Sequence, residues 1–291
     1  MHIRRVVDDF CVSAGLSLRA YWWRRPGVAN FGDELNPYLL ARLSGKRIIH
    51  EDAKGPQLYV AAIGSILHLT NENAIVWGAG IIEVGTSVKR PHEIRAVRGP
   101  RTAETLRKLG YQCPEVYGDP ALLLPLVFPM TNIEPTHEIG IIPHFVDYRH
   151  VCDLAPEDTL VIDLLRPIEE IIQQICSCKR IVSSSLHGII VSHAYGRPAI
   201  RAKFSDRIYG DGVKFDDYSF SVNLPAMVPF DFTSHLPSLE CLVAYVDDKS
   251  ELPKIDVRGL LDSAPFKLNI NHLHLASAAR IGIQDNVAAR Q

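Results

Sequence analysis

Short apolar segments alternate with helical periods along most of this chain, and that alternation restricts the fold more than any other feature. Leu58–Ile63 and Ala74–Trp77 are typical of buried strands, and each is followed directly by a glycine. Pro100 marks the first turn of a helix whose apolar residues recur at helical spacing until Gly110. Strand, helix and strand in repeated succession predict parallel sheets with helices on both faces.

The same alternation starts again beyond residue 137. Glu138–Ile142 and Arg180–Ser183 predict further strands, Pro167 begins an amphipathic helix, and another helix is expected from Gly188 to Tyr195. A polar stretch with two prolines separates the two series and predicts a linker. We therefore predict an α/β fold of two Rossmann-like domains that face each other across a cleft. The predicted units are an N-terminal domain (1–130), a linker (131–137), a C-terminal domain (138–265) and a loosely ordered tail (266–291).

The charge and cysteine content exclude several classes of protein. Lys and Arg number 31 against 33 Asp and Glu, a net charge of -2, so the chain has no global basic field to bind nucleic acid. The six cysteines contain no CxxC pair, which argues against a zinc site and a disulfide scaffold. The most apolar stretch, 121–130, is interrupted by Pro125 and Pro129, and the N-terminus lacks a signal-peptide pattern. We expect a cytoplasmic protein with no transmembrane segment.

The segment Ser183-Ser184-Ser185-Leu-His187-Gly188 is the strongest candidate for a functional site. A predicted strand ends in hydroxyl residues and a helix begins near His187. Free backbone N–H groups and hydroxyls there would hold a phosphate or carboxylate, with the imidazole beside it as an acid or base. The alternative is that the serines only cap the helix and the histidine bonds a backbone carbonyl.

A second candidate is the segment from Asn30 to Asn36, in which Gly32 precedes the carboxylates of Asp33 and Glu34. An apolar period follows, so the segment predicts a helix start that faces the cleft. Asp33 can accept a proton there or orient a sugar hydroxyl. Taken alone, the local pattern favours the alternative that Asp33 is a helix N-cap.

Glycines and arginines mark two more strand ends. Gly78-Ala-Gly80 does not complete a dinucleotide motif, because Glu83 occupies the third glycine position and Arg98 stands where an acid is needed. A tight turn that lets a ligand approach the backbone is the better interpretation. Arg98 is the best placed of three arginines at 95–101 to bind a carboxylate or phosphate, and a solvated surface arginine is the alternative.

The ordered set of motifs resembles the polysaccharide pyruvyltransferase family over roughly residues 28 to 220. The Asn-Phe-Gly-Asp start and the Lys-Phe-Asp-Asp-Tyr segment look most like the bacterial exopolysaccharide ketal pyruvyltransferases. The motifs, in order, are Asn30-Phe-Gly-Asp-Glu-Leu-Asn36, Gly78-Ala-Gly80, Val97-Arg-Gly-Pro-Arg-Thr102, Gly118-Asp-Pro120, Ser183-Ser-Ser-Leu-His-Gly188 and Lys214-Phe-Asp-Asp-Tyr218.

The resemblance implies transfer of pyruvate from phosphoenolpyruvate to two hydroxyls of one sugar, which forms a cyclic ketal and releases phosphate. It also implies an architecture similar to the GT-B glycosyltransferases, with the acceptor on the N-terminal domain and the donor on the C-terminal one. No metal or organic cofactor is expected. The implied partners are phosphoenolpyruvate and a saccharide acceptor, either a polysaccharide or its lipid-linked precursor. His187 is expected to transfer a proton at the donor, and Asp33 to orient or deprotonate the acceptor diol, although the two roles can be exchanged.

One departure concerns the donor site. Several family members carry an arginine at the position of Ser185, where a serine brings no charge. We expect Lys203 to replace that cation, with Lys214, Arg201 and Arg207 as the other candidates. The expected donor-binding residues are therefore Arg98, Ser183, Ser184, Ser185 and Lys203. The expected acceptor or cleft residues are Asn30, Gly32, Glu34, Asn36, Gly78 and Gly80.

Two other functions stay open. A nucleotide-sugar glycosyltransferase would use an acid such as Asp206 or Asp211 to bind the ribose, and a degenerate member would bind saccharide without catalysis. A lipid-linked acceptor would place the protein at the inner face of the cytoplasmic membrane. The segment Tyr21-Trp-Trp-Arg-Arg25 can serve there as a patch for peripheral membrane association. An aromatic cluster packed under the first helix is the favoured alternative.

Overall fold

The computed structural model describes residues 8–9, 11–131, 133–270 and 273–274. The elements of the first half are β1 (Ser17–Tyr21), α2 (Phe31–Ser44), β2 (Arg47–His50), β3 (Tyr59–Ala61), η1 (Leu67–Leu69), β4 (Ala74–Trp77), β5 (Glu93–Ala96), α3 (Pro100–Lys108), η2 (Pro120–Leu123) and α4 (Leu124–Val127). Those of the second half are β6 (His137–Ile142), α5 (Tyr148–Leu154), β7 (Leu160–Val161), α6 (Ile168–Cys176), β8 (Cys178–Ser183), α7 (Leu186–Ala194), β9 (Ala199–Lys203), α8 (Val213–Ser221), β10 (Phe230–Asp231), α9 (Leu239–Lys249) and α10 (Arg258–Asp262).

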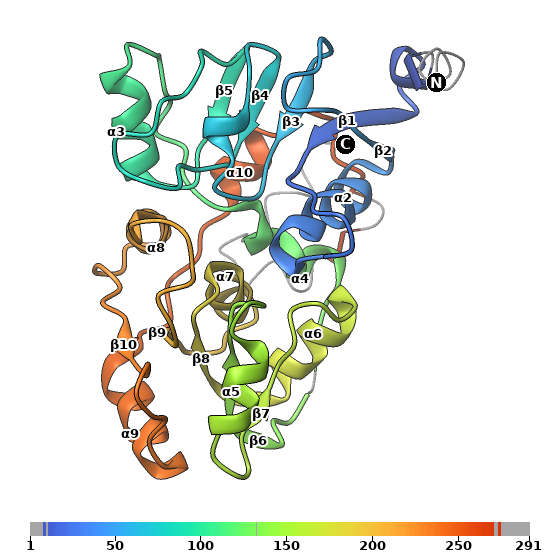
Figure 1. Ribbon diagram of the computed structural model, residues 1–291. Coiled ribbons are helices and arrows are strands. Elements are labelled where there is room, and N and C mark those ends of the chain that lie inside the picture. Colours follow the sequence, from blue (N-terminus) through green and yellow to red (C-terminus); the bar gives the residue numbers. More distant parts are fainter. Residues whose placement is uncertain (1–7, 10, 132, 271–272, 275–291) are drawn as a thin grey trace.

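Within the described residues the strands form two five-stranded sheets, and every strand pair is parallel (Figure 1). The first sheet has the order β2-β1-β3-β4-β5, and the second has the order β10-β9-β8-β6-β7. The α/β organisation with parallel sheets is therefore confirmed. The division into two facing domains with a cleft, and its boundaries, stay predictions.

The helices that the periodicity predicted are present. Helix α3 begins at Pro100 and is followed by Gly110 with a φ of 80°, a conformation that glycine adopts without steric cost. Helix α6 buries Ile171, Ile172 and Ile175 on one face. Helix α7 begins two residues before the predicted start because Ser185, the residue before it, already caps the helix.

Helix α2 tolerates an internal proline because a neighbouring side chain compensates for it. Pro37 has no N–H, so the carbonyl of Asp33 loses its helical donor, and Asn36 Nδ2 donates to that carbonyl instead at 3.1 Å. The same amide donates to Ile63 O at 2.9 Å, and Asn36 Oδ1 accepts from Ile63 N at 2.9 Å. Asn36 therefore joins the first turns of α2 to the residues that follow β3.

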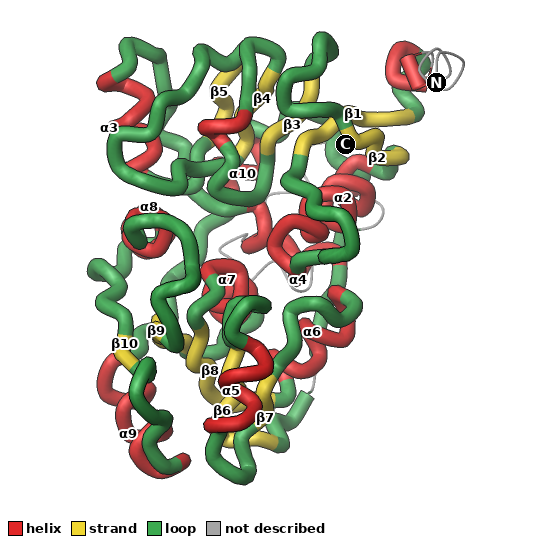
Figure 2. Tube along the Cα trace, in the orientation of Figure 1, coloured by secondary structure: helices red, strands yellow, loops and turns green. Residues whose placement is uncertain are grey.

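A layer of helices lies between the two sets of strands. Figures 1 and 2 show α2, α4 and α7 there, and buried side chains from all three belong to one apolar cluster with residues of both sheets. In that cluster Leu39 of α2, Leu124 of α4 and Ile190 of α7 have no exposed surface. Two smaller clusters cover the other side of each sheet. The helix layer is thus a core shared by both sheets.

The end of the described chain returns to the first sheet. Helix α10 packs beneath β4, where Trp77 Nε1 donates to Leu260 O at 2.9 Å. The predicted C-terminal tail lies mostly outside the described residues, and in its described part Asn269 N donates to Leu43 O at 2.7 Å. No helix in the described part of the chain is both long and apolar enough to cross a membrane.

The Asn36 bridge predicts a stability change that can be measured. Asn36→Ala should lower the free energy of unfolding by about 2 to 4 kcal/mol, because the buried N–H and C=O of Ile63 lose their partners. Denaturant unfolding of both proteins measures the change. Gln173→Ala, at an exposed site of α6, is the control and should change stability by less than about 0.5 kcal/mol. Equal effects from the two variants would show that the bridge contributes nothing.

Candidate active site at the starts of α2 and α7

His187 lies in the first turn of α7 and rests on the first turn of α2. A Cβ at residue 32 would overlap His187 Nδ1, so only glycine lets the imidazole approach the helix this closely. Asp33 follows Gly32 in the same turn, and its electrostatic interaction with His187 favours the charged carboxylate. Two predicted motifs separated by about 150 residues therefore meet at one place.

Burial raises the pKa of the Asp33 carboxyl above its ordinary value, against lowering effects from Asn30 and His187. Asn30 Nδ2 donates to Asp33 Oδ2 at 2.7 Å, and Asn30 rather than Asp33 occupies the N-cap position of α2. The N-cap alternative for Asp33 is therefore wrong. A carboxylate with a raised pKa is a stronger base than an ordinary one, and this one lies in the turn on which the His187 imidazole rests.

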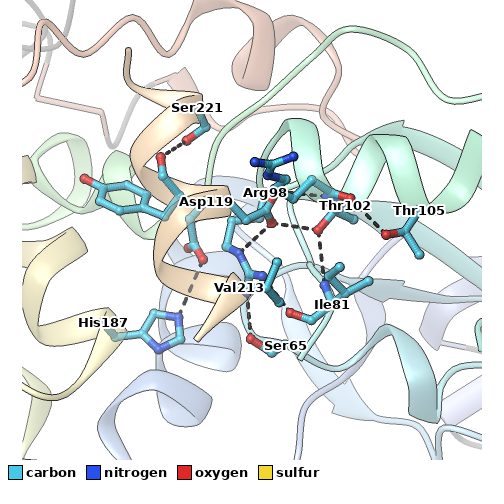
Figure 3. A network of polar contacts seen from close by, with 12 residues as sticks. Ser65, Ile81, Arg98, Thr102, Thr105, Asp119, His187, Val213 and Ser221 are labelled. Atoms are coloured by element: carbon cyan, nitrogen blue, oxygen red, sulfur yellow. Dashed lines mark hydrogen bonds and ion pairs between the residues drawn. The ribbon is translucent and has the colours of Figure 1, made fainter. Parts of the chain in front are cut away.

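Asp119 approaches His187 from the other side. Its Oδ2 atom lies 3.6 Å from His187 Nε2 (Figure 3). Its Oδ1 atom accepts from Ala121 N at 2.9 Å. Asp119 belongs to the Gly118-Asp-Pro120 motif of the family resemblance and had no predicted role. No local pattern indicated that it would lie beside His187.

The hydroxyl groups of the three serines before His187 form hydrogen bonds within the protein. Ser183 Oγ donates to Ile142 O at 2.9 Å, Ser184 Oγ accepts from His144 N at 2.8 Å, and Ser185 Oγ accepts from Gly188 N at 3.4 Å. All three side chains are buried. The capping alternative thus describes Ser185, while anion binding by the serines stays a prediction.

Arg98 has no exposed surface. It donates through Nε to Asp217 Oδ2 at 3.0 Å, through Nη1 to Ser65 Oγ at 2.7 Å and through Nη2 to Ile81 O at 2.7 Å (Figure 3). A Cβ at Gly80 would overlap this guanidinium. The solvated-surface alternative for Arg98 is therefore wrong, and donor binding by Arg98, which stays a prediction, would require it to leave these partners.

The remaining predicted cleft residues have structural contacts of their own. Gly78 has a φ of 97°, and a Cβ there would overlap the ring of Pro120. Asn36 is fully buried on Ile63, and Glu34 is half-buried. Contacts between these residues and an acceptor stay predictions.

A pocket of about 260 Å³ adjoins this region through Ser184, and three cations and two carboxylates line it: Arg201, Lys203, Lys214, Asp206 and Asp211. We call it the basic pocket because the cations outnumber the carboxylates. Lys203 pairs with Asp206 at 2.7 Å. Within the described residues, by contrast, no hydrogen bond or ion pair reaches the Lys214 ammonium. Burial and the positive charges of Arg98 and Arg201 lower the pKa of Lys214 to about 8. Among the residues that the structure describes, Lys214 thus lines the pocket without a negatively charged partner.

The other predicted groups are engaged nearby. Arg207 pairs with the buried Asp147 at 2.7 Å, and Arg201 donates to Met227 O at 3.0 Å. Asp211, a candidate ribose ligand for a nucleotide sugar, accepts from Val84 N at 2.8 Å. In the described part of the chain, no three His, Cys, Asp or Glu side chains gather as metal ligands.

The aromatic segment after β1 is largely packed inside. Tyr21 and Trp22 are buried, while Trp23 is 38% exposed. The ring of Trp22 lies edge-on to His50, whose Nε2 is 3.1 Å from Trp22 O. This arrangement supports the packed-cluster alternative for two of the three aromatic residues, and peripheral membrane association stays a prediction.

The sequence of the chain is similar to known proteins. The family described as polysaccharide pyruvyl transferase matches residues 19–201, more than half of the chain. An uncharacterized protein of Acanthamoeba polyphaga mimivirus is 31% identical over 199 residues, which cover 65% of this chain and 69% of the viral protein. No solved structure matches the chain. The family match contains Asp33, Asp119 and His187 and ends before Lys203 and Lys214.

The strained charge of Lys214 predicts a pH-dependent gain in stability when it is removed. A pKa lowered from 10.5 to about 8 corresponds to roughly 3 kcal/mol of disfavoured charging in the folded state. Lys214→Met should therefore raise the free energy of unfolding by about 1 to 3 kcal/mol at pH 7. The gain should shrink between pH 8 and 10.5, because folded wild-type protein then holds Lys214 neutral while the unfolded chain still charges it.

Denaturant unfolding at pH 7 and pH 10 measures this difference. Lys254→Met, at an exposed lysine, is the control and should show no comparable gain at either pH. A Lys214→Met protein that is less stable than wild type at pH 7 would contradict the interpretation.

Proposed function

The chain belongs to the polysaccharide pyruvyl transferase family, and we propose that it transfers pyruvate from phosphoenolpyruvate to two hydroxyls of one sugar as a cyclic ketal. The observation that carries this proposal is the junction at which His187 rests on Gly32 beside Asp33. It supplies two proton-transfer groups from opposite halves of the chain at the ends of two parallel sheets. In open α/β sheets this is where substrates bind.

The reaction needs both an acid and a base. C3 of phosphoenolpyruvate takes up a proton, and C2 becomes electrophilic. One sugar hydroxyl bonds to C2 and the second displaces phosphate, so C2 ends with two C–O bonds to the sugar. Of the two hydroxyl protons, one balances the proton gained at C3 and the other leaves with phosphate. No redox partner is required.

His187 and Asp33 divide these tasks in the proposal. His187 transfers the proton at the donor, and Asp33 orients or deprotonates the acceptor diol. The raised pKa of Asp33 supports this role, because a more basic carboxylate removes a hydroxyl proton more readily. The two roles can also be exchanged, with Asp33 as the acid and His187 as the base.

The donor anion is proposed to bind at the basic pocket. Lys214 has no carboxylate partner in the described structure, whereas Lys203 already pairs with Asp206. We therefore favour Lys214 over Lys203 as the cation that compensates for the serine at position 185. A phosphate or carboxylate group there would relieve the repulsion among Lys214, Arg201 and Arg98.

The acceptor is proposed to be a sugar of a polysaccharide or of its lipid-linked precursor. The family description supports a saccharide. A lipid-linked form would bring the protein to the inner face of the cytoplasmic membrane. Trp23 would then be the exposed aromatic residue available to the interface.

The donor proposal predicts selective stabilisation by ligand. At one hundred times its dissociation constant, phosphoenolpyruvate should stabilise wild-type protein by about 2.7 kcal/mol, a rise in Tm of a few degrees. Lys214→Met should lose most of this rise, while Lys254→Met keeps it. Thermal unfolding with phosphoenolpyruvate, UDP and GDP measures the effect. A rise with UDP or GDP alone would favour a nucleotide-sugar glycosyltransferase instead.

The junction of His187 with α2 predicts a loss of turnover from one added methyl group. Gly32→Ala should lower kcat at least about 100-fold because the new Cβ displaces the imidazole, while the rise in Tm with phosphoenolpyruvate persists. Phosphate release from phosphoenolpyruvate in the presence of saccharide measures kcat. Gly259→Ala in α10 is the control for adding a methyl group to a helix. Full activity in Gly32→Ala would exclude this junction as the catalytic centre.

A further inference from the structure

Asp119 and His187 each bury a polar atom that has no hydrogen-bond partner within the described residues. Asp119 Oδ2 and His187 Nε2 are both in this state, and they face each other at 3.6 Å. Asp119 has no exposed surface, and the His187 side chain is 13% exposed. Unpaired buried polar atoms are costly, so two of them aimed at each other indicate a pair that closes in the working state.

We propose that Asp119 is the positioning residue for His187: its carboxylate accepts the Nε2 proton and leaves Nδ1 as the nitrogen that exchanges a proton with the substrate. The pairing stands on the geometry of the free protein, and the proton exchange rests on the proposed pyruvyl transfer. Catalytic hydrogen bonds that are long in a free enzyme commonly shorten when substrate binds. A shift of less than about 1 Å would bring Asp119 Oδ2 and His187 Nε2 within hydrogen-bond distance.

The two sides of the imidazole have different environments, and this fixes the roles of its nitrogens. Nε2 points to the buried carboxylate, while Nδ1 lies over Gly32, at the turn that carries Asp33. A carboxylate on one nitrogen selects the tautomer and stabilises the charged imidazolium after the other nitrogen gains a proton. Asp119 would thus make Nδ1 the base and hold the ring against rotation.

The backbone holds Asp119 in this orientation. Its Oδ1 atom accepts from Ala121 N at 2.9 Å, so one oxygen is fixed by the start of η2 and the other is directed at the imidazole. The groups that face the pair are Asp33 from α2 and Tyr218 from α8. Burial and the charge of Asp119 raise the pKa of Tyr218 well above its ordinary value, so its phenol stays neutral. The charges of Arg98 and Asp217 compensate each other in a buried ion pair.

The tautomer of His187 tests the pairing without any assay of function. Nitrogen-15 NMR of labelled wild-type protein, with the His187 signals assigned by their loss in His187→Gln, should show the proton on Nε2 in the neutral ring. Asp119→Asn should weaken this preference, because the amide can donate to Nε2 as well as accept from it. A neutral ring with its proton on Nδ1 in wild-type protein would overturn the proposal, and this measurement needs no variant at Asp119.

Kinetics test the functional part. Asp119→Asn should lower kcat about 100-fold or more while KM for phosphoenolpyruvate changes less than about threefold, and Asp119→Glu should recover part of the loss. The double variant with His187→Ala should be no slower than His187→Ala alone, because the two residues act as one unit. Undiminished kcat in Asp119→Asn would overturn the role in turnover.

A matched control separates these effects from loss of a cap. Asp256 also accepts from the backbone amide two residues on, Arg258 N, but lies on the surface before α10. Asp256→Asn should leave the tautomer and kcat unchanged. If wild-type protein releases no phosphate from phosphoenolpyruvate, the proposed function fails, while the NMR result still decides whether Asp119 pairs with His187.

Discussion

The buried ion pair between Arg98 and Asp217 is the interaction on which the arrangement of the site depends. Asp217 accepts from Arg98 Nε at 3.0 Å, and from Thr102 through its backbone N at 2.9 Å and its Oγ1 at 2.6 Å. A lone buried charge would destabilise the fold by about 3 to 5 kcal/mol, so neither partner can be removed alone without a large loss of stability. The pair locks α8 to the start of α3. Because Lys214 and Tyr218 belong to the same helix, it also fixes the basic pocket and the Tyr218 hydroxyl, which lies 2.9 Å from His193 Nδ1 in α7.

Glycine at the contact points makes these close approaches feasible. Gly99 lies against the backbone carbonyl of Asp217, Gly80 against Arg98, and Gly32 against His187, and at each of these glycines a Cβ would overlap its neighbour. None of the three has the left-handed backbone that usually explains a glycine. These three motif glycines therefore serve to bring one chain segment against another. The imidazole that reaches α2 in this way is held in a geometry that a single methyl group would break.

The sequence was sufficient for the α/β organisation with parallel sheets, but not for the partners of each charged group. Apolar periodicity is a local property, so the parallel strands and helices such as α3 and α6 could be predicted. The partner of Arg98 lies 119 residues away, and no local pattern distinguishes a buried ion pair from a ligand-binding arginine. The same limit applies to Asp119, because no local pattern indicated that its carboxylate lies beside His187. Position in the sequence favoured Lys203 over Lys214, and only the structure locates the carboxylate of Asp206 that pairs with Lys203.

The cations near the site differ in whether an aspartate of the protein neutralises their charge. Arg98 and Arg207 are each neutralised by a buried aspartate, Asp217 and Asp147, and serve the fold. Lys214 is buried beside other cations with no counter-ion among the described residues, and its pKa is lowered to about 8 as a result. Such an arrangement lowers the stability of the free protein and becomes favourable only when an anion arrives. The lack of a counter-ion at Lys214 is therefore the physical basis for the proposal that the donor binds there, since an anionic donor would recover the energy that the free protein loses by burying this charge.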